Sequence, residues 1–312
     1  MPSVTVEHSA LDEATRRGLQ AEVKQLPTVW LYDERGSRLY EEITRLPEYY
    51  LPRREREILR GRAAEIARRT RAQTLVELGA GSARNTRILL DALDVERFVP
   101  LDVSEHVLRT SAQAIAAAYP RIWVEPLVGD FERDLDELPG SRRLVALLGS
   151  TIGNLYPEQR VRLLATLGEE DALLVGLDLV KDAARLAAAY DDPKGVTEAF
   201  VRNALVAANR ELGATFFQHR FAYGARWDPE HEWMDIGFRA RRAHTVTIPR
   251  LGLAVAFEQG EPLRVEISAK FRRERLEREA TRAALRVESW WTDRARDFAV
   301  ALVVPRERRS HA

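Results

Sequence analysis

The stretch TLVELGAG, residues 74–81, decides the expected fold. Its first five residues form a short apolar run, and two glycines follow at positions 79 and 81. A helical pattern then covers 85–93. A short apolar run bounded by glycine is typical of a buried strand. Glycines at such a turn let a ligand approach the backbone, and the N-terminus of the following helix offers free N–H groups. We therefore expect a strand, a ligand-binding turn and a helix here.

Short apolar runs alternate with helical patterns up to residue 179. We expect strands at 74–78, 97–102, 122–128, 144–148 and 172–179, and helices at 85–93, 105–118 and 157–167. Buried runs of this length between helices predict a parallel sheet with helices on both faces. The pattern is that of a Rossmann-like α/β domain.

The alternation then gives way to a different pattern. A helical stretch covers 183–213, with Gly213 as its expected C-cap. We expect strands at 216–223, 238–248, 253–257 and 264–271, a charged helix at 272–284, and two last strands at 285–290 and 297–303. Before the first strand, helices are expected at 41–46 and 53–69, joined by an ordered connector that holds Pro47 and Pro52. The expected parts are an N-terminal helical segment (1–54) that packs with the insertion, an α/β domain (55–182), an α+β insertion (183–270) and a return to the α/β domain (271–312).

Composition excludes several classes of protein. The 312 residues carry 48 basic and 48 acidic side chains and no cysteine. Balanced charge gives no overall field for nucleic acid or an anionic membrane. Without cysteine there are no disulfides, cysteine nucleophiles or thiolate metal sites, and a reducing cytosol fits. No run approaches ~18 uncharged apolar residues, and the N-terminus lacks a signal-peptide core. We expect a cytoplasmic monomer with no nucleic-acid or membrane partner.

Motifs narrow the chemistry further. A dinucleotide-binding turn needs a third glycine where this chain has Arg84, and the phosphate-loop pattern is absent. The stretch GSTIG, residues 149–153, is not the G-x-S-x-G of a hydrolase. The six histidines form no H-E-x-x-H or other metal spacing, so we expect no metal.

Acidic residues follow the next two expected strands. Asp102 lies at the end of 97–102, near the distance from the glycine turn at which a carboxylate binds ribose hydroxyls. Asp130 could accept from an adenine amino group, and Phe131 could pack on the ring. Singly, each acid is more often a helix N-cap. Together, at consecutive strand ends, they predict a nucleoside-binding edge of the sheet.

With these features the chain resembles the histidine-specific N-alpha methyltransferases of ergothioneine biosynthesis. The glycine turn is the E-x-G-x-G form of class I S-adenosylmethionine methyltransferases. The resemblance extends over about 25–305, in the stretches YDERGS (32–37), ITRLPEYY (43–50), VELGAG (76–81), GSTIGN (149–154), DLVKD (178–182), YDDP (190–193) and WWTD (290–293). It implies a class I methyltransferase domain with an inserted α+β substrate-binding domain. The implied reaction is trimethylation of the L-histidine α-amino group, giving hercynine, with S-adenosylmethionine as cosubstrate.

The resemblance also implies the site residues. Its cofactor-binding residues fall on Tyr32, Gly79, Gly81, Asn85, Asp102, Asp130 and Phe131. Its substrate-binding residues fall on Tyr49, Asn154, Tyr190, Ile236, Glu266, Ile267 and Ser268, with Asn154 and Tyr49 as the catalytic pair. Asn154 would orient the amine and hold the carboxylate, to which the tyrosines would donate, and Glu266 and Ser268 would bind the imidazole from one strand face. Without the resemblance, those two residues are more simply a solvated strand face.

Three positions depart from the family pattern. Asn85 stands where a lysine is expected, and Ile236 where a methionine is expected, next to a glycine at 237 that is smaller than expected. A reshaped pocket would admit another aromatic amino acid. The alternatives are therefore the same chemistry on another small amino acid or amine, or a cofactor-binding protein without catalysis. A DNA or protein methyltransferase ranks last, because the motif (N/D)-P-P-Y and a basic patch with aromatic residues are both missing.

Overall fold

The computed structural model describes residues 3–131 and 138–306. The chain divides into two compact units. We call Met1–Tyr49 with Asp182–Ser268 the insertion unit, and Tyr50–Lys181 with Ala269–Ala312 the sheet unit. The chain therefore passes between the units three times, after residues 49, 181 and 268.

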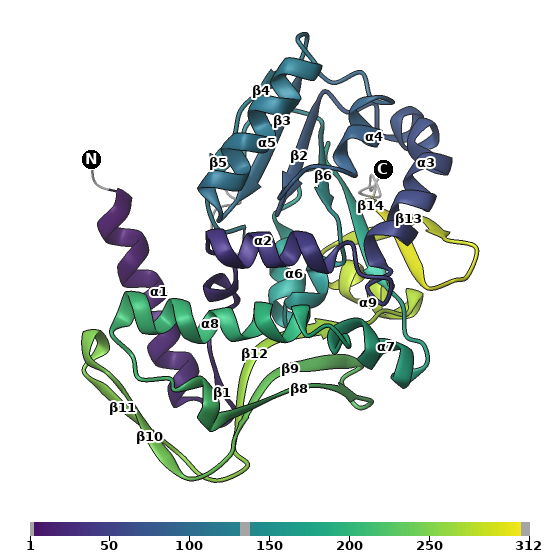
Figure 1. Cartoon of the computed structure of the whole chain (residues 1–312). Helices are drawn as coiled ribbons and strands as arrows, with labels where there is room; N and C mark the ends of the chain where they lie inside the picture. The colour runs from purple at the N-terminus through teal and green to yellow at the C-terminus, as the bar shows by residue number, and fades with distance from the viewer. Residues whose placement is uncertain (1–2, 132–137, 307–312) are drawn as a thin grey trace. The chain divides into compact units, whose positions relative to one another are not determined.

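The sheet unit is built on a sheet with the strand order β13-β14-β7-β6-β2-β3-β4, in which β5 also pairs with β3 (Figure 1). The strands are β2 (Thr74–Leu78), β3 (Arg97–Asp102), β4 (Trp123–Val124), β5 (Leu127–Val128), β6 (Arg143–Leu147), β7 (Ala172–Asp178), β13 (Leu285–Thr292) and β14 (Phe298–Pro305). Neighbours from β4 to β7 pair in parallel, and β14 pairs antiparallel with both β7 and β13. This arrangement confirms the predicted Rossmann-like α/β fold.

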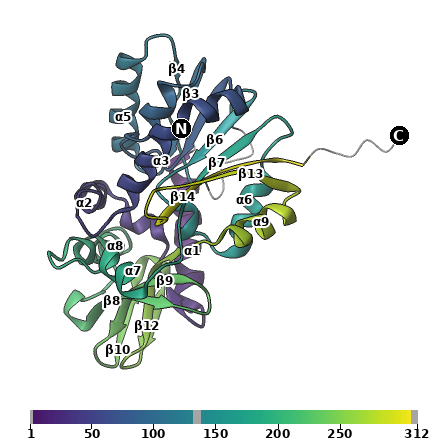
Figure 2. The same ribbon diagram turned by 90° about the vertical axis from the view of Figure 1, so that its right-hand side faces the viewer.

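Helices lie on both faces of this sheet, as the uniform apolar runs require. Figure 2 shows α3 and α5 on one face and α6 and α9 on the other. Their bounds are α3 (Leu51–Thr70), α5 (Glu105–Ala118), α6 (Pro157–Ala165) and α9 (Arg273–Arg282), with a short α4 (Thr86–Leu90) that contacts α3. Every residue of β2 and β7 is buried, because both of their faces are covered.

The insertion unit combines helices with two smaller sheets. A four-stranded sheet has the order β1-β12-β9-β8, and β10 and β11 form a separate antiparallel pair. The strands are β1 (Lys24–Gln25), β8 (Phe221–Asp228), β9 (Trp233–Ala240), β10 (His244–Ile248), β11 (Leu253–Phe257) and β12 (Pro262–Ala269). The helices are α1 (Ser3–Gln20), α2 (Glu34–Ile43), α7 (Ala183–Tyr190) and α8 (Val196–Leu212), and α8 packs against α2 and a 3-10 turn, η1 (Thr28–Leu31).

The prediction of one helix over 183–213 is wrong, because this stretch forms two helices, α7 and α8. Pro193 interrupts it, and the Asp192 carboxylate accepts the N–H of Thr197 at 2.8 Å in the first turn of α8. The C-cap prediction is confirmed, since Gly213 has φ +65°.

Other predicted bounds also need correction. The strand expected at 216–223 begins only at 221, and the run 238–248 is divided between β9 and β10. The alternating pattern runs through the turn at 241–243, which has neither glycine nor proline to mark it. The helix expected at 41–46 is α2, which begins and ends earlier. Pro52 lies inside the first turn of α3, where a missing N–H costs no hydrogen bond.

We expect the stability of the sheet unit to depend on a buried ion pair between α6 and α9. The Arg160 guanidinium is fully buried and donates to both carboxylate oxygens of Glu279, with Nη2–Oε1 at 2.6 Å. Glu279→Ala leaves this cation buried without its partner, which should lower the free energy of unfolding by about 3–5 kcal/mol. Denaturant titration measures the loss. Glu158→Ala, which removes an exposed partner of Arg282, is the matched control and should unfold at nearly the wild-type midpoint; equal losses in both variants would contradict the expectation.

Candidate active site

The glycine loop after β2 is open to a ligand. Gly79 and Gly81 have φ +69° and +47°, a region that favours glycine. The Gly79 N–H donates to the Leu101 carbonyl of β3 at 2.8 Å, which ties the loop to the sheet. A Cβ on Gly81 would meet no atom within 4 Å, whereas one on Gly79 would lie 3.8 Å from Thr151 Cγ2 and 3.9 Å from Phe131 Cε1. The loop therefore has free space on one side and the Phe131 ring on another.

Asp102 at the end of β3 is fixed against this loop. Its Oδ2 accepts the N–H of Gly81 at 2.9 Å, and its Oδ1 accepts the N–H of Ser104 at 2.8 Å. Burial raises the pKa of this carboxyl, and the backbone N–H donors act in the opposite direction. A carboxylate offers about four acceptor sites in all, so Asp102 can also accept from a ribose hydroxyl. Asp130 and Phe131 follow β5 and are both half-buried.

Asn85, at the N-cap of α4, forms hydrogen bonds with two side chains of α3 in the sheet unit. Its Nδ2 donates to Glu55 Oε2 at 2.7 Å, and its Oδ1 accepts from Arg56 Nε at 3.2 Å. The other oxygen of Glu55 accepts the N–H of Gly149 at 2.8 Å. Burial raises the pKa of Glu55 to about 7 and that of Glu77 to about 8. Sequence reasoning missed Glu55, because charged residues surround it on α3 and no pattern marks the buried one.

Asn154 lies in the sheet unit, at the end of a 3-10 turn, η2 (Thr151–Asn154). The turn follows two consecutive left-handed residues, Gly149 at φ +69° and Ser150 at φ +63°. A left-handed serine costs about 1–3 kcal/mol, so its surroundings must hold it in place. A Cβ on Gly153 would come within 2.8 Å of the Ala269 carbonyl oxygen, so only glycine fits there. The loop that carries Asn154 is thus closely constrained.

Most of the predicted histidine-binding residues come together in the insertion unit. Tyr190 ends α7, and its hydroxyl lies 2.8 Å from Ser268 Oγ on β12. The Tyr49 and Tyr190 rings meet edge to face, with centroids 6.1 Å apart. Glu266, two residues before Ser268, shares its strand face and is also buried. Burial raises the pKa of Tyr49 well above 10, with smaller contributions from neighbouring tyrosines and Glu266, so this phenol is a hydrogen-bond donor at neutral pH.

Tyr32 also belongs to the insertion unit, although the resemblance places it with the cofactor. Its ring lies 6.1 Å from that of Tyr40 and 5.6 Å from that of Phe200. Tyr40 in turn lies 6.4 Å from Tyr49, so these rings form a continuous aromatic group. Sequence reasoning did not single out Tyr40, because one aromatic residue on a helix is ordinarily part of the core.

The two positions on β9 at which we expect a departure from the family pattern, Ile236 and Gly237, are tightly packed. Ile236 is fully buried in β9. A Cβ on Gly237 would lie 2.3 Å from the carbonyl oxygen of Leu263, so the neighbouring backbone fills the space of the missing side chain. The glycine therefore opens no extra room at that point. The side chain of Ile267 points to the opposite face of β12 from that of Glu266.

The part of the chain that the structure describes holds neither a metal-binding cluster nor a membrane-spanning helix. Within 3–131 and 138–306, no group of three or more His, Asp or Glu side chains is placed to hold a metal ion. None of the helices in those ranges has the length and apolar character needed to cross a membrane.

Comparisons with known proteins identify the family. Residues 11–305 match the family of histidine-specific, S-adenosylmethionine-dependent methyltransferases. The chain is 49% identical over 304 residues to a histidine N-alpha-methyltransferase of Mycolicibacterium smegmatis, and 48% identical over 304 residues to that of Mycobacterium tuberculosis, with 95% of each chain aligned in both cases. It is 32% identical to ergothioneine biosynthesis protein 1 of Neurospora crassa, over 86% of this chain and 32% of that protein. The resemblance inferred from the sequence motifs is confirmed: the chain belongs to the histidine-specific, S-adenosylmethionine-dependent methyltransferases.

Proposed function

We propose that this enzyme transfers three methyl groups from S-adenosylmethionine to the α-amino group of L-histidine, giving hercynine, the first step of ergothioneine biosynthesis. The supporting observation is the buried polar group of Tyr49, Tyr190, Glu266 and Ser268, in which a hydroxyl pair lies at 2.8 Å. A carboxylate and a hydroxyl on one strand face match the two nitrogens of an imidazole, and phenol donors match a carboxylate. Histidine offers both groups.

The sheet unit binds the methyl donor in this proposal. S-adenosylmethionine supplies the methyl group on a sulfonium, and the chain binds and orients it. The open loop at Gly79 and Gly81 lets the donor approach the backbone. Asp102 accepts from the ribose hydroxyls, Asp130 accepts from the adenine amino group, and Phe131 packs on the ring.

The acceptor must present a neutral amine in line with the sulfonium. Glu266 accepts the imidazole N–H, and Ser268 serves the other nitrogen. Tyr49 and Tyr190 donate to the carboxylate, while Asn154 orients the amine. Because burial keeps Tyr49 protonated, its role is to donate and position, and water takes the proton from the amine. Most of the acceleration then comes from positioning.

We also propose that the enzyme acts as a monomer in the cytosol. The residues assigned to donor and acceptor all belong to one chain, so a second copy is not needed to complete either set. Balanced charge and the lack of cysteine are compatible with this setting.

Mass spectrometry of amino acids incubated with enzyme and S-adenosylmethionine tests the function directly. We expect histidine to gain three methyl groups while tryptophan, tyrosine and phenylalanine stay nearly unmodified, because only an imidazole uses both Glu266 and Ser268. Preference for another amino acid would overturn the histidine assignment and leave the methyl-transfer chemistry. No methylation of any amino acid, together with measurable cofactor binding, would instead indicate a non-catalytic protein.

Glu266→Ala should impair the use of histidine. A hydrogen bond to a charged group contributes about 1.5–3 kcal/mol, so kcat/KM for histidine should fall roughly ten- to a hundredfold. The dissociation constant for S-adenosylmethionine should stay near the wild-type value, because Glu266 is assigned to the imidazole and not to the donor. Glu258→Ala, at an exposed glutamate just after β11, is the control. Wild-type kcat and KM in Glu266→Ala would remove this residue from the site.

Asp102→Asn should weaken binding of the methyl donor. The amide keeps the size of the side chain but replaces one acceptor oxygen by an NH₂ group, which cannot accept both a backbone N–H and a ribose hydroxyl. Loss of charge-assisted bonds predicts a dissociation constant raised about tenfold or more in calorimetric titration. Glu105→Gln changes an exposed acid on the following helix and should bind the donor normally. Equal affinities for the two variants would argue against a ribose-binding role of Asp102.

A further inference from the structure

A fully buried carboxylate, Asp178 at the end of β7, binds three side chains of the sheet unit. Its Oδ1 and Oδ2 accept from the Tyr50 hydroxyl at 2.9 and 3.1 Å, and its Oδ2 pairs with Lys270 Nζ at 2.9 Å. The Lys181 ammonium also pairs with Asp178 and donates to the Tyr50 hydroxyl at 2.6 Å. We call Tyr50, Asp178, Lys181 and Lys270 the Asp178 cluster.

The partners of Asp178 lie at the three points at which the chain passes from one unit to the other, after residues 49, 181 and 268, which we call the crossings. Tyr50 is the first residue of the sheet unit after the first crossing, and Lys181 is the last before the second. Lys270 is the second residue after the third crossing. One carboxylate therefore holds a side chain at every crossing. These contacts support one another, because a buried carboxylate needs its charged and hydrogen-bonding partners, and loosening one leaves the others with an undercompensated charge.

The backbone of Asp178 extends the same arrangement to the loop before Asn154. Its N–H donates to Ser150 Oγ at 3.0 Å, and its carbonyl accepts the N–H of Phe271 at 2.8 Å. The first of these bonds holds the left-handed Ser150, from which the turn leading to Asn154 begins. One residue thus fixes the loop of Asn154 and all three crossings.

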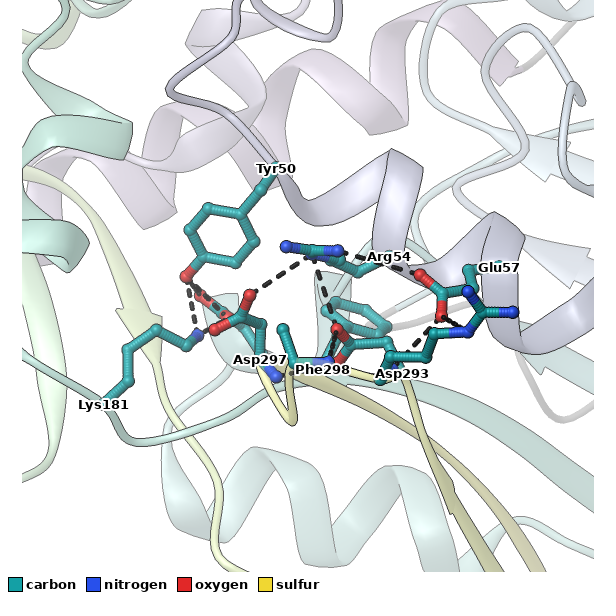
Figure 3. Close-up of polar contacts among 10 residues, drawn as sticks. Tyr50, Arg54, Glu57, Lys181, Asp293, Asp297 and Phe298 are labelled. Atoms are coloured by element: carbon teal, nitrogen blue, oxygen red, sulfur yellow. Dashed lines mark hydrogen bonds and ion pairs between the residues drawn. The ribbon is translucent and has the colours of Figure 1, made fainter.

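A second ion group holds the start of α3 in place. Arg54, one turn after Tyr50, lies between two buried carboxylates, with Nε 3.4 Å from Asp293 Oδ2 and 3.2 Å from Asp297 Oδ2 (Figure 3). The Arg54 N–H also bonds to the Tyr50 carbonyl at 3.1 Å. The side chain and the backbone of Tyr50 are therefore both anchored, and its hydroxyl has a defined position for Asp178 to bind.

We propose that Asp178 is a positioning residue for methyl transfer, which acts by holding the three chain crossings. Tyr49 directly precedes Tyr50, and Ser268 lies two residues before Lys270, so two proposed histidine-binding residues extend from points that the cluster holds. The proposal rests on the proposed function. In this proposal Asp178 does not contact either substrate. It fixes the backbone next to Tyr49 and Ser268, which do contact histidine.

Asp178→Asn and Tyr50→Phe test the proposal through kinetics and hydrogen exchange. We expect Asp178→Asn to lower kcat/KM for histidine by about tenfold or more, because small misplacements of reacting groups are costly, and to change the dissociation constant for S-adenosylmethionine less than about twofold. Tyr50→Phe, which removes one hydroxyl, should lower kcat/KM about threefold. Amide exchange should rise together in peptides that span residues 49/50, 181/182 and 268/269. Asp182→Asn is the control, because an asparagine still caps α7.

Several outcomes would overturn the proposal. One is folded Asp178→Asn and Tyr50→Phe protein with wild-type kcat/KM for histidine. A second is faster amide exchange at only one of the three crossings in Asp178→Asn. A third is a loss of histidine turnover in this variant that is fully explained by an equal loss of affinity for S-adenosylmethionine. If Asp178→Asn does not fold, Lys181→Met and Tyr50→Phe decide the question by the same measurements. If the wild-type enzyme does not methylate histidine, the proposed function fails, and the exchange pattern alone decides whether the cluster holds the crossings.

Discussion

Parallel pairing of β2 with β3 on one side and β6 on the other is the constraint on which the positions of the residues proposed to bind the donor depend. Parallel strands bring their carboxyl ends to one edge of the sheet, so the loops after them gather there. The glycine loop follows β2, Asp102 ends β3, and Gly149 follows β6. The bond from Gly81 to Asp102 then ties the loop after β2 to the end of β3, and the bond from Gly149 to Glu55 ties the loop after β6 to α3.

The sheet unit has two buried carboxylates, Asp178 and Glu55, whose charges are compensated in different ways. Asp178 is paired with two lysine ammonium groups and a phenol, so its charge is compensated. Glu55 receives a backbone N–H and the amide of Asn85, which are dipoles without net charge. Burial then raises the pKa of Glu55 to about 7, close to neutrality. A lysine in place of Asn85, as the family pattern leads one to expect, would put a cation beside this carboxylate and lower its pKa. The departure at Asn85 therefore changes the charge balance next to the glycine loop.

Sequence patterns predicted the parts of the fold that local signals specify. The helix at 105–118 was predicted with its observed bounds, and Gly213 was recognised as a cap, because caps and apolar periodicity are local. The division at Pro193 was missed, since one helical pattern continues on both sides of it. The bond between Tyr190 and Ser268 joins residues 78 positions apart, and only the family resemblance pointed to it. The partners of Glu55 and Asp178 depend wholly on tertiary contacts; the strand expected at 172–179 predicts burial of Asp178, but no local pattern distinguishes Glu55 from a surface acid.

Separation of the two residue sets along the chain has a consequence for specificity. Gly79, Gly81 and Asp102 belong to the sheet unit, whereas Tyr190, Glu266 and Ser268 belong to the insertion unit. In the proposed function, substitutions at these residues of the insertion unit can therefore change recognition of the acceptor while the glycine loop and Asp102 are kept. Tyr32 and Asn154 are exceptions, because each lies in the other unit from the rest of its set. The tight packing at Gly237 argues that such change does not come from that position, because the backbone already fills the available space. In the proposed function, the face of β12 that bears Glu266 and Ser268 is where a different acceptor would have to be accommodated, since a side chain that lacks the imidazole nitrogens would not make the hydrogen bonds proposed for these two residues.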